Sequence, residues 1–468
     1  MEKIIQENNR KIIIIFFVAL SLSLVFFFSS CKRFVEIDSP ITQITSSSVF
    51  TSEATATAAV VGIYSRMMQG SGFASGGTNS ILVLSGLSSD EFKSYSNPGN
   101  QFYTNSLLPT NDNVRGFLWN EPYQYIYTAN SILEGLGSSY GVSAAGKQEL
   151  TGEAKFVRAF CYFYLVNLFG DVPLHLTTDY RNNNVAFRTP QSQVYQQIIA
   201  DLKDAQNSLP GDYAFSDGER TRPNKWAATA LLARVYLYME DWANSETQST
   251  SIINSSAYAL VTDLDNVFSK NSSEAIWQLL PVQPGFNTNE GRYLILTSIP
   301  TIVSLSDYVA NAFEAGDQRK AKWVGSFTSG STTYFYPFKY KTKSGSDLTE
   351  YSMVFRLAEQ YLIRAEARAR QDNIPGARND LNTIRTRAGL PDTNDSLQAD
   401  LLRDIMQERR VELFAEWAQR WFDLKRTNSI DAILGPVKGT TWQPTDALYP
   451  IPQLEIQNDP NIVQNTGY

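Results

Sequence analysis

The chain has 468 residues, of which 43% are hydrophobic and 12% aromatic, and it carries a formal net charge of −7. This mildly acidic balance does not provide the basic surface that nucleic-acid binding requires, so no nucleic-acid partner is expected. With only two cysteines and one histidine, the chain has neither a disulfide framework nor a cluster of histidine and cysteine ligands, and we predict no metal and no cofactor.

The first residues have the pattern of an export signal. An apolar run over residues 12–28 is followed at once by Ser29, Ser30 and Cys31, as at a lipoprotein signal-peptidase site. A transmembrane helix is the alternative, but the run is slightly shorter than the roughly 20 residues that a span needs. We therefore predict a lipoprotein signal peptide over residues 1–30, acylation of Cys31 and a lipidated polar tether over residues 31–48.

Residues 49–256 predict a helical region. The second cysteine of the chain, Cys161, lies in an apolar helix of this region and is expected to be a buried free thiol. Residues 70–110 are rich in Gly, Ser and Asn and are expected to be mostly loop. The expected helices cover residues 52–68, 112–136 and 147–169, and two more begin near Thr189-Pro190 and Pro223.

Residues 257–349 interrupt the helical pattern. Short β-like runs occur at residues 275–279 and 333–336, separated by segments rich in Gly, Asn and Ser. We predict an irregular, partly β insertion that packs on the helical scaffold.

Residues 351–426 carry the clearest helical repeats. Apolar residues recur at helical spacing from Leu357 to Ala369, and a turn at residues 372–376 precedes a second apolar stripe that begins at Ala377. A third helix is expected beyond Pro391, with one apolar side formed by Leu402, Ile405, Leu413, Trp417 and Leu424.

A helix, a short turn and a second helix with facing small residues are typical of a tetratricopeptide-like unit. Residues 225–253 repeat the pattern, with Ala233 aligned on Ala365 and Ser245 on Ala377. The predicted fold is mainly α, with tetratricopeptide-like helix pairs forming an α-solenoid scaffold.

Four segments resemble the SusD/RagB family of nutrient-binding outer membrane lipoproteins. They read RAFCYFYLVNLFGDVPL, LAEQYLIRAEARAR, ERRVELFAEWAQRWFDLKR and LYPIPQLEIQNDPNIVQNTGY. The resemblance implies an N-terminal region over residues 49–256 and a C-terminal region over residues 257–468. It also implies a protein on the outer face of the outer membrane that closes a SusC-type TonB-dependent transporter and binds oligosaccharide, or in some members peptide, without cleaving it.

A sugar site needs flat aromatic rings for the C–H faces of the sugar and polar groups for its hydroxyls. Two loop-rich segments offer both kinds of residue, although each ring has the alternative of filling the core. The predicted ligand-binding residues are Asp90, Tyr95, Asn100 and Tyr103 in the first segment, and Phe286, Arg292, Tyr293 and Trp323 in the second.

Two other patterns could indicate an enzyme. Glu408, Glu412 and Glu416 could supply the acids of a glycoside hydrolase, but their four-residue spacing among arginines favours an ion-pair ladder along one helix. His175 lies among apolar residues, and we predict no catalytic role for it. A helical module that binds protein partners and no small ligand is a third alternative.

Overall fold

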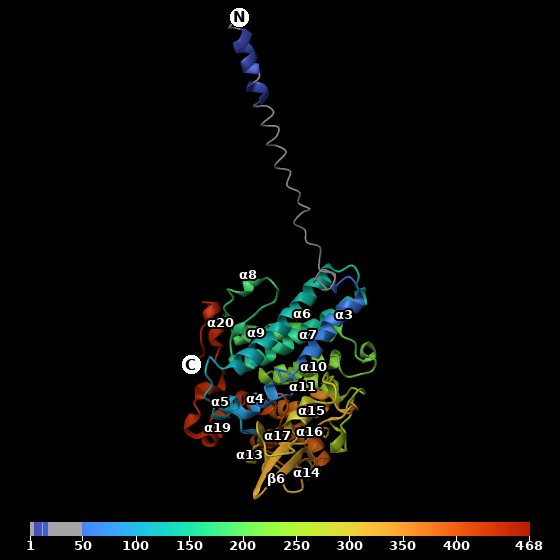
Figure 1. Ribbon diagram of the computed structural model, residues 1–468. Helices are drawn as coiled ribbons and strands as arrows, with labels where there is room; N and C mark the ends of the chain where they lie inside the picture. The colour runs from blue at the N-terminus through green and yellow to red at the C-terminus, as the bar shows by residue number, and fades with distance from the viewer. Residues whose placement is uncertain (1–3, 12, 17–48) are drawn as a thin grey trace. The chain divides into compact units, whose positions relative to one another are not determined.

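The structure, a computed structural model, describes residues 4–11, 13–16 and 49–468 (Figure 1). The chain divides into two units, residues 1–49 and 50–468. In the first unit, residues 4–11 and 13–16 are helical. The predicted lipidation site Cys31 and the whole predicted tether, residues 31–48, lie outside the described residues. Among the described residues, no helix has both the length and the apolar character that a membrane span requires.

Two helical hairpins form the centre of the second unit. They consist of α10 (Lys225–Tyr238) with α11 (Trp242–Ile253), and of α15 (Leu357–Arg370) with α16 (Ile374–Arg387). Although about a hundred residues separate them in sequence, α11 packs directly on α15. The small residues at the aligned positions are buried, and the Ser245 hydroxyl donates to the Ala233 carbonyl over 3.0 Å. The predicted tetratricopeptide-like pairs are therefore confirmed.

Further helices extend this stack in both directions. On the N-terminal side, α6 (Glu121–Ser138), α7 (Ala144–Phe169) and α9 (Gln191–Ser208) pack side by side, and α9 contacts α10 (Figure 1). On the other side, α17 (Gln398–Glu412) covers α15 and α16. The helices pack continuously from α6 to α17, so each has one face in the core. Their apolar residues therefore recur at helical spacing, which is why the fold class could be predicted.

The C-terminal half of α7 is fully buried in the stack. The Ser143 hydroxyl caps the first turn of the helix, and Gly170 ends the helix with a φ of 74°, a conformation that favours glycine. Every residue from Phe156 to Phe169 is buried. Cys161 in this stretch is a buried free thiol, as predicted.

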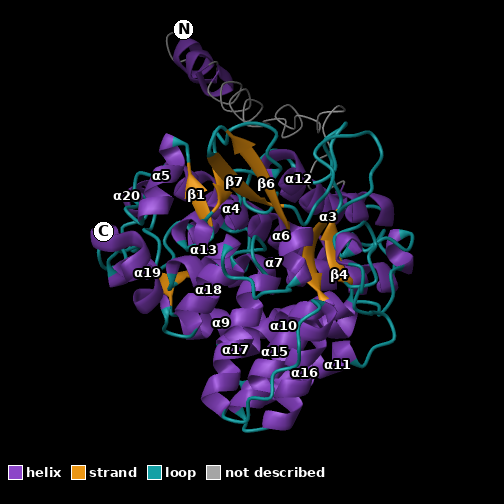
Figure 2. Cartoon of the chain, turned by 90° about the horizontal axis from the view of Figure 1, so that it is seen from below, coloured by secondary structure: helices purple, strands orange, loops and turns teal. Residues whose placement is uncertain are grey.

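Within residues 49–468, the strands form three small antiparallel sheets. The largest has the order β1-β5-β7-β6, and Figure 2 shows β1, β7 and β6 together on the side away from α15 and α16. The predicted strands at 275–279 and 333–336 are confirmed as β4 and within β7. The bounds are β1 Phe92–Ser94, β2 Val172–Pro173, β3 Arg188–Thr189, β4 Ala275–Leu279, β5 Val303–Leu305, β6 Val324–Ser329, β7 Thr332–Pro337 and β8 Ser352–Arg356. The strand β1, which precedes residues 257–349, joins the large sheet, and β8, which follows them, pairs with β4. The insertion therefore shares its sheets with the chain segments on both sides of it.

Residues 70–110 are more ordered than the composition indicated. They contain α4 (Ile81–Ser88), which is buried at every residue, as well as β1 and α5 (Asn97–Thr104). The glycine-rich loop ahead of α4 is held by Asn289, whose amide donates to the carbonyls of Met68, Gly70 and Ser75. The prediction of a loop was wrong for α4, because its eight residues are too short and too uniformly apolar to show a helical period.

The expected third helix is interrupted. It ends at Glu412, and α18 (Gln419–Arg426) begins after a bend in which Ala415, Trp417 and Ala418 all have positive φ. The Trp417 indole donates to the Met353 carbonyl over 2.7 Å, which holds the bend against β8. Tertiary contacts therefore override a helical pattern that runs through the bend in the sequence.

The remaining short elements connect these layers or close the chain. Beyond α18, Tyr449 donates its backbone N–H to the Leu168 carbonyl, so the C-terminal segment returns to the end of α7. The remaining helices are α3 Glu53–Met68, α8 Tyr180–Asn183, α12 Asn289–Leu294, α13 Asp307–Ala310, α14 Gln318–Trp323, α19 Ile430–Lys438 and α20 Gln453–Asn458.

Candidate functional site

Aromatic rings gather on one face of the four-stranded sheet. We call it the aromatic face and define it as Tyr95, Phe327, Tyr334 and Tyr336. Phe327 on β6 lies directly opposite Tyr334 on β7, so the two side chains share a face. Tyr336 is two residues further along β7 and points the same way.

Tyr95, one residue beyond β1, extends the aromatic face across the sheet. Its ring meets that of Tyr334 edge to face, with centroids 6.0 Å apart and planes at 71°. Its hydroxyl lies 3.2 Å from Oγ of Ser304 on β5, and its backbone N–H donates to the Ile302 carbonyl. The Tyr95 side chain is thus fixed in direction while 41% of it stays exposed.

A glycine gives Tyr336 room to lie across the neighbouring strand. Gly325 on β6 is paired with Tyr336, and a Cβ atom at this position would come within 2.3 Å of the tyrosine ring. Phe327, Tyr334 and Tyr336 are all half-buried. The sheet therefore presents partly open ring faces beside hydroxyl groups, which suits the C–H faces and hydroxyls of a sugar.

The structure distributes the predicted ligand residues over several places. Tyr95 joins the aromatic face, and Asn100 is exposed on α5. Tyr103 is half-buried, with the Lys438 ammonium 4.5 Å from its ring centroid. In the insertion, the Arg292 guanidinium packs over Phe286 at 4.0 Å and over Tyr293 at 4.9 Å, and all three side chains are half-buried.

Two predicted ligand residues lie in the interior instead. Both carboxylate oxygens of Asp90 are bound by Arg420, and one of them also by Arg410, and Asp90 is only 3% exposed. Trp323 is fully buried and donates its indole N–H to the Leu264 carbonyl over 2.9 Å. These contacts give Asp90 and Trp323 a structural role in the observed conformation.

Sequence reasoning did not assign Phe327, Tyr334 or Tyr336 to the site. The alternation of Tyr334 and Tyr336 was visible in the β-like run 333–336, and it could have indicated a common face. Their contact with Tyr95 could not be foreseen, because it depends on the pairing of β1 with β5 and of β5 with β7.

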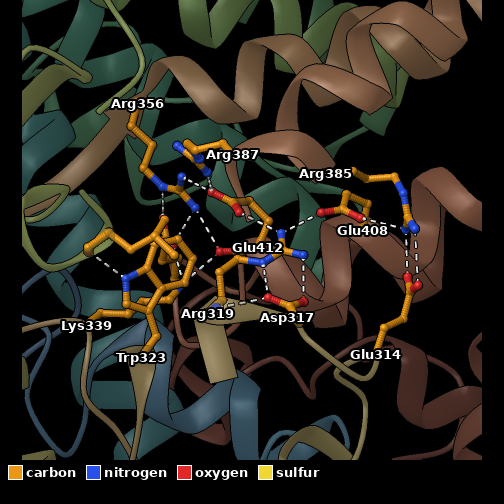
Figure 3. Close-up of polar contacts among 12 residues, drawn as sticks. Glu314, Asp317, Arg319, Trp323, Lys339, Arg356, Arg385, Arg387, Glu408 and Glu412 are labelled. Atoms are coloured by element: carbon orange, nitrogen blue, oxygen red, sulfur yellow. Dashed lines mark hydrogen bonds and ion pairs between the residues drawn. The ribbon is translucent and has the colours of Figure 1, made fainter. Parts of the chain in front are cut away.

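Two of the glutamates considered as catalytic acids, Glu408 and Glu412, belong to a buried ion cluster, which we define as Glu274, Asp317, Arg319, Arg356, Arg387, Glu408 and Glu412. Figure 3 labels the members of this cluster other than Glu274. Arg319 binds Glu408 over 2.5 Å and Glu412 over 2.8 Å, and Arg356 binds Glu412 over 2.6 Å. The cations come from outside α17, so the expected ion-pair ladder along one helix is wrong for Glu408 and Glu412. Glu416 lies in the bend after α17, where it binds Arg356 and Lys339.

The buried ion cluster keeps the Glu412 carboxylate charged by surrounding it with arginines. Burial opposes ionisation of Glu412, but Arg387, Arg356 and Arg319 together hold the pKa of that carboxyl well below its usual range. A carboxylate in this state is neither a proton donor at neutral pH nor within reach of a polysaccharide. Among the described residues, no group of three or more His, Cys, Asp or Glu side chains is placed to hold a metal ion.

Comparison with known proteins gives consistent matches along the chain. A family model described as starch-binding and associating with the outer membrane matches residues 34–237, and one described as the SusD family matches residues 306–468. SusD-like protein P2 of Formosa agariphila is 27% identical over 97% of this chain and 99% of its own length.

Solved structures agree with these matches. A SusD superfamily protein from Bacteroides vulgatus has a TM-score of 0.80 at 21% identity, covering 90% of this chain and all of its own. A laminarin binding SusD-like protein has a TM-score of 0.75 at 24% identity, again over 90% of this chain and all of its own. The chain therefore belongs to the SusD/RagB family of glycan-binding, outer-membrane-associated proteins.

Proposed function

We propose that this protein is a cell-surface lipoprotein that binds oligosaccharide on the aromatic face and delivers it to a SusC-type TonB-dependent transporter in the outer membrane. The observation that carries the binding role is the row of partly open rings formed by Tyr95, Tyr334, Tyr336 and Phe327. A relative of the same fold is described as laminarin binding, which supports a glycan as the ligand.

The aromatic face suits a pyranose ring for a physical reason. One side of such a ring is covered by C–H groups, and burying that side against an aromatic ring removes apolar surface from water. The phenol hydroxyls and the Ser304 hydroxyl lie at the edges of the rings, where they can exchange hydrogen bonds with the sugar. Asn100, Tyr103, Phe286, Arg292 and Tyr293 remain proposed additional contacts.

A glycoside hydrolase is the less favoured alternative. Hydrolysis needs two opposed carboxyl groups beside the bound sugar. The three glutamates considered for this chemistry are held by arginines or lysine, with Glu408 only 1% exposed and Glu412 fully buried. A peptide ligand stays open as a second member of the binding class, because ring faces and amides also bind extended peptides.

The delivery role rests on the N-terminal pattern and on the family. The apolar run that ends at Ser29, Ser30 and Cys31 supports a lipid-anchored protein, and the family description associates its members with the outer membrane. A binding protein tethered there would raise the local concentration of glycan beside its transporter.

The test compares Tyr95→Ala/Tyr334→Ala with the wild type by isothermal titration with starch and laminarin oligosaccharides. We expect affinity for the bound glycan to fall by about tenfold or more, because truncating a central aromatic contact typically costs over 1 kcal/mol. Tyr140→Ala, at a fully exposed tyrosine outside the aromatic face, is the matched control and should bind as the wild type does.

Unchanged affinity in the double variant would contradict the aromatic face as the binding site. Release of reducing ends during incubation with either glycan would contradict a purely binding role. Binding of peptides but of neither glycan would favour the peptide alternative.

A further inference from the structure

A second concave site lies at another part of the fold. It is a cleft of about 850 Å³ between α6, the segment that follows β2, and α20. In Figure 1, α8 and α20 lie at the upper left of the second unit, whereas β6, the strand that carries Phe327, is at its lower end. The volume falls within the roughly 300–1,000 Å³ that is typical of small-ligand sites.

The cleft combines exposed rings with neutral amides. Tyr127 on α6 is 56% exposed and Tyr180 on α8 is 68% exposed, which leaves large ring surfaces open to a ligand. Gln124, Asn183 and Asn458 are among its polar lining residues. This is the same pairing of ring faces with hydrogen-bonding groups that a sugar requires, here in a walled cleft rather than on an open sheet.

Hydrogen bonds hold the walls of the cleft in place without a ligand. The Tyr123 hydroxyl donates to the Pro173 carbonyl over 2.8 Å, which ties α6 to β2. The Glu134 carboxylate accepts from the backbone N–H of Thr178 over 2.8 Å. On the far side, the Asn461 amide donates to the Val185 carbonyl over 3.0 Å. A cleft preformed in this way does not have to lose further conformational entropy on binding.

His175 lines the cleft, but the protein covers the acceptor nitrogen of its ring. Its Nε2 atom is buried and has no hydrogen-bond partner, although its backbone N–H and carbonyl are both bonded to the Tyr162 hydroxyl. The imidazole donates its other ring N–H to the Asn183 backbone, and burial lowers the pKa of His175, so the ring is neutral at pH 7. Nε2 is therefore a hydrogen-bond acceptor that lacks a donor.

The charges of the lining argue for a neutral ligand. Glu455 and Asp459 contribute carboxylates, and Arg66 is the cationic side chain among the lining residues. The Trp119 indole N–H is already donated to Glu455. An anionic sugar would meet these two carboxylates, whereas the hydroxyls of a neutral sugar can donate to both of them.

We propose that this cleft is a second carbohydrate site, which binds a neutral oligosaccharide through the rings of Tyr127 and Tyr180 and through the side-chain amides of its lining. The inference goes beyond the binding role of the aromatic face and does not depend on it. Two sites on one chain would let one long glycan bind at both, which raises its apparent affinity above that at either site alone.

The test measures calorimetric stoichiometry and hydrogen exchange of the purified protein with starch and laminarin oligosaccharides and with polygalacturonate. In the aromatic-face variant Tyr95→Ala/Tyr334→Ala, we expect neutral oligosaccharide still to bind and to protect residues 173–184 from exchange. In Tyr127→Ala/Tyr180→Ala, whose exposed positions leave the core intact, that protection should be lost and affinity at this site should fall about tenfold.

Absence of protection at residues 173–184 with every probe, or the same protection in Tyr127→Ala/Tyr180→Ala, would overturn the proposal. Tighter binding of polygalacturonate than of the neutral probes would overturn the neutral class. Loss of all binding in Tyr95→Ala/Tyr334→Ala would also overturn the second site, while leaving the aromatic face in place.

Discussion

Arg319 is a cation with no exposed surface, and its charge is balanced within the protein by three carboxylates from two parts of the chain. Asp317 lies two residues away, but Glu408 and Glu412 come from α17. A buried ion pair gains little over an apolar core of the same shape, whereas removal of one partner leaves an uncompensated charge. The buried ion cluster therefore makes the packing of α14 against α17 depend on single residues.

Replacing Glu412 with Gln should destabilise the protein strongly. The change leaves Arg319, Arg356 and Arg387 short of one negative charge in the interior, at an expected cost of about 3–5 kcal/mol in the free energy of unfolding. The measurement is the midpoint of urea-induced unfolding. The matched control is Arg403→Gln, which removes an exposed pair with Asp400 on the same helix and should leave the midpoint unchanged.

The same residue should also give a pH dependence. Because the folded pKa of Glu412 is held below the ordinary value of 4.5, the unfolded chain binds the proton more readily than the folded chain. The stabilisation from Glu412 is thus complete above about pH 4.5 and decreases as the pH falls toward the folded pKa. If Glu412→Gln lost stability on acidification as steeply as the wild type, this assignment would be wrong.

At the scale of elements, the close approach of helices in each hairpin depends on small side chains. Ala365 on α15 and Ala377 on α16 are fully buried in one apolar cluster. Replacing Ala365 with Leu should lower the free energy of unfolding by about 1–3 kcal/mol, because the core has no room for the added carbons. Ala243→Leu, at an exposed position of α11, is the control. Equal stability of the two variants in urea would show that the hairpin is not closely packed there.

These hairpins were predictable because apolar residues repeat at helical spacing over two adjacent helices. The bend at residues 413–418 was not, since nothing in its local sequence shows that Trp417 bonds to Met353 or that Glu416 binds Arg356. Three of the four residues of the aromatic face were similarly hidden. Tyr95 could be proposed from its polar loop, but its aromatic neighbours on β6 and β7 depend on strand pairing across more than two hundred residues.

At the scale of the whole molecule, the sequence predicts that one cysteine holds the protein on the membrane. Cys31→Ala should abolish incorporation of labelled palmitate, because acylation requires the thiol of that residue. Cys161→Ala removes the only other cysteine, which is buried in α7, and should leave the labelling unchanged. Label retained in Cys31→Ala, or lost in Cys161→Ala, would contradict the predicted lipid anchor.

The pairing of β1 with β5 joins residue 92 to residue 305, and β7 adds residues up to 337. Contacts between positions so distant in sequence form slowly, because a long loop must close before they give any stability. The aromatic face is therefore absent from any chain that ends before residue 337, at about three quarters of the protein. A truncated molecule of that kind would keep most of the helical scaffold but lack the surface to which we assign glycan binding.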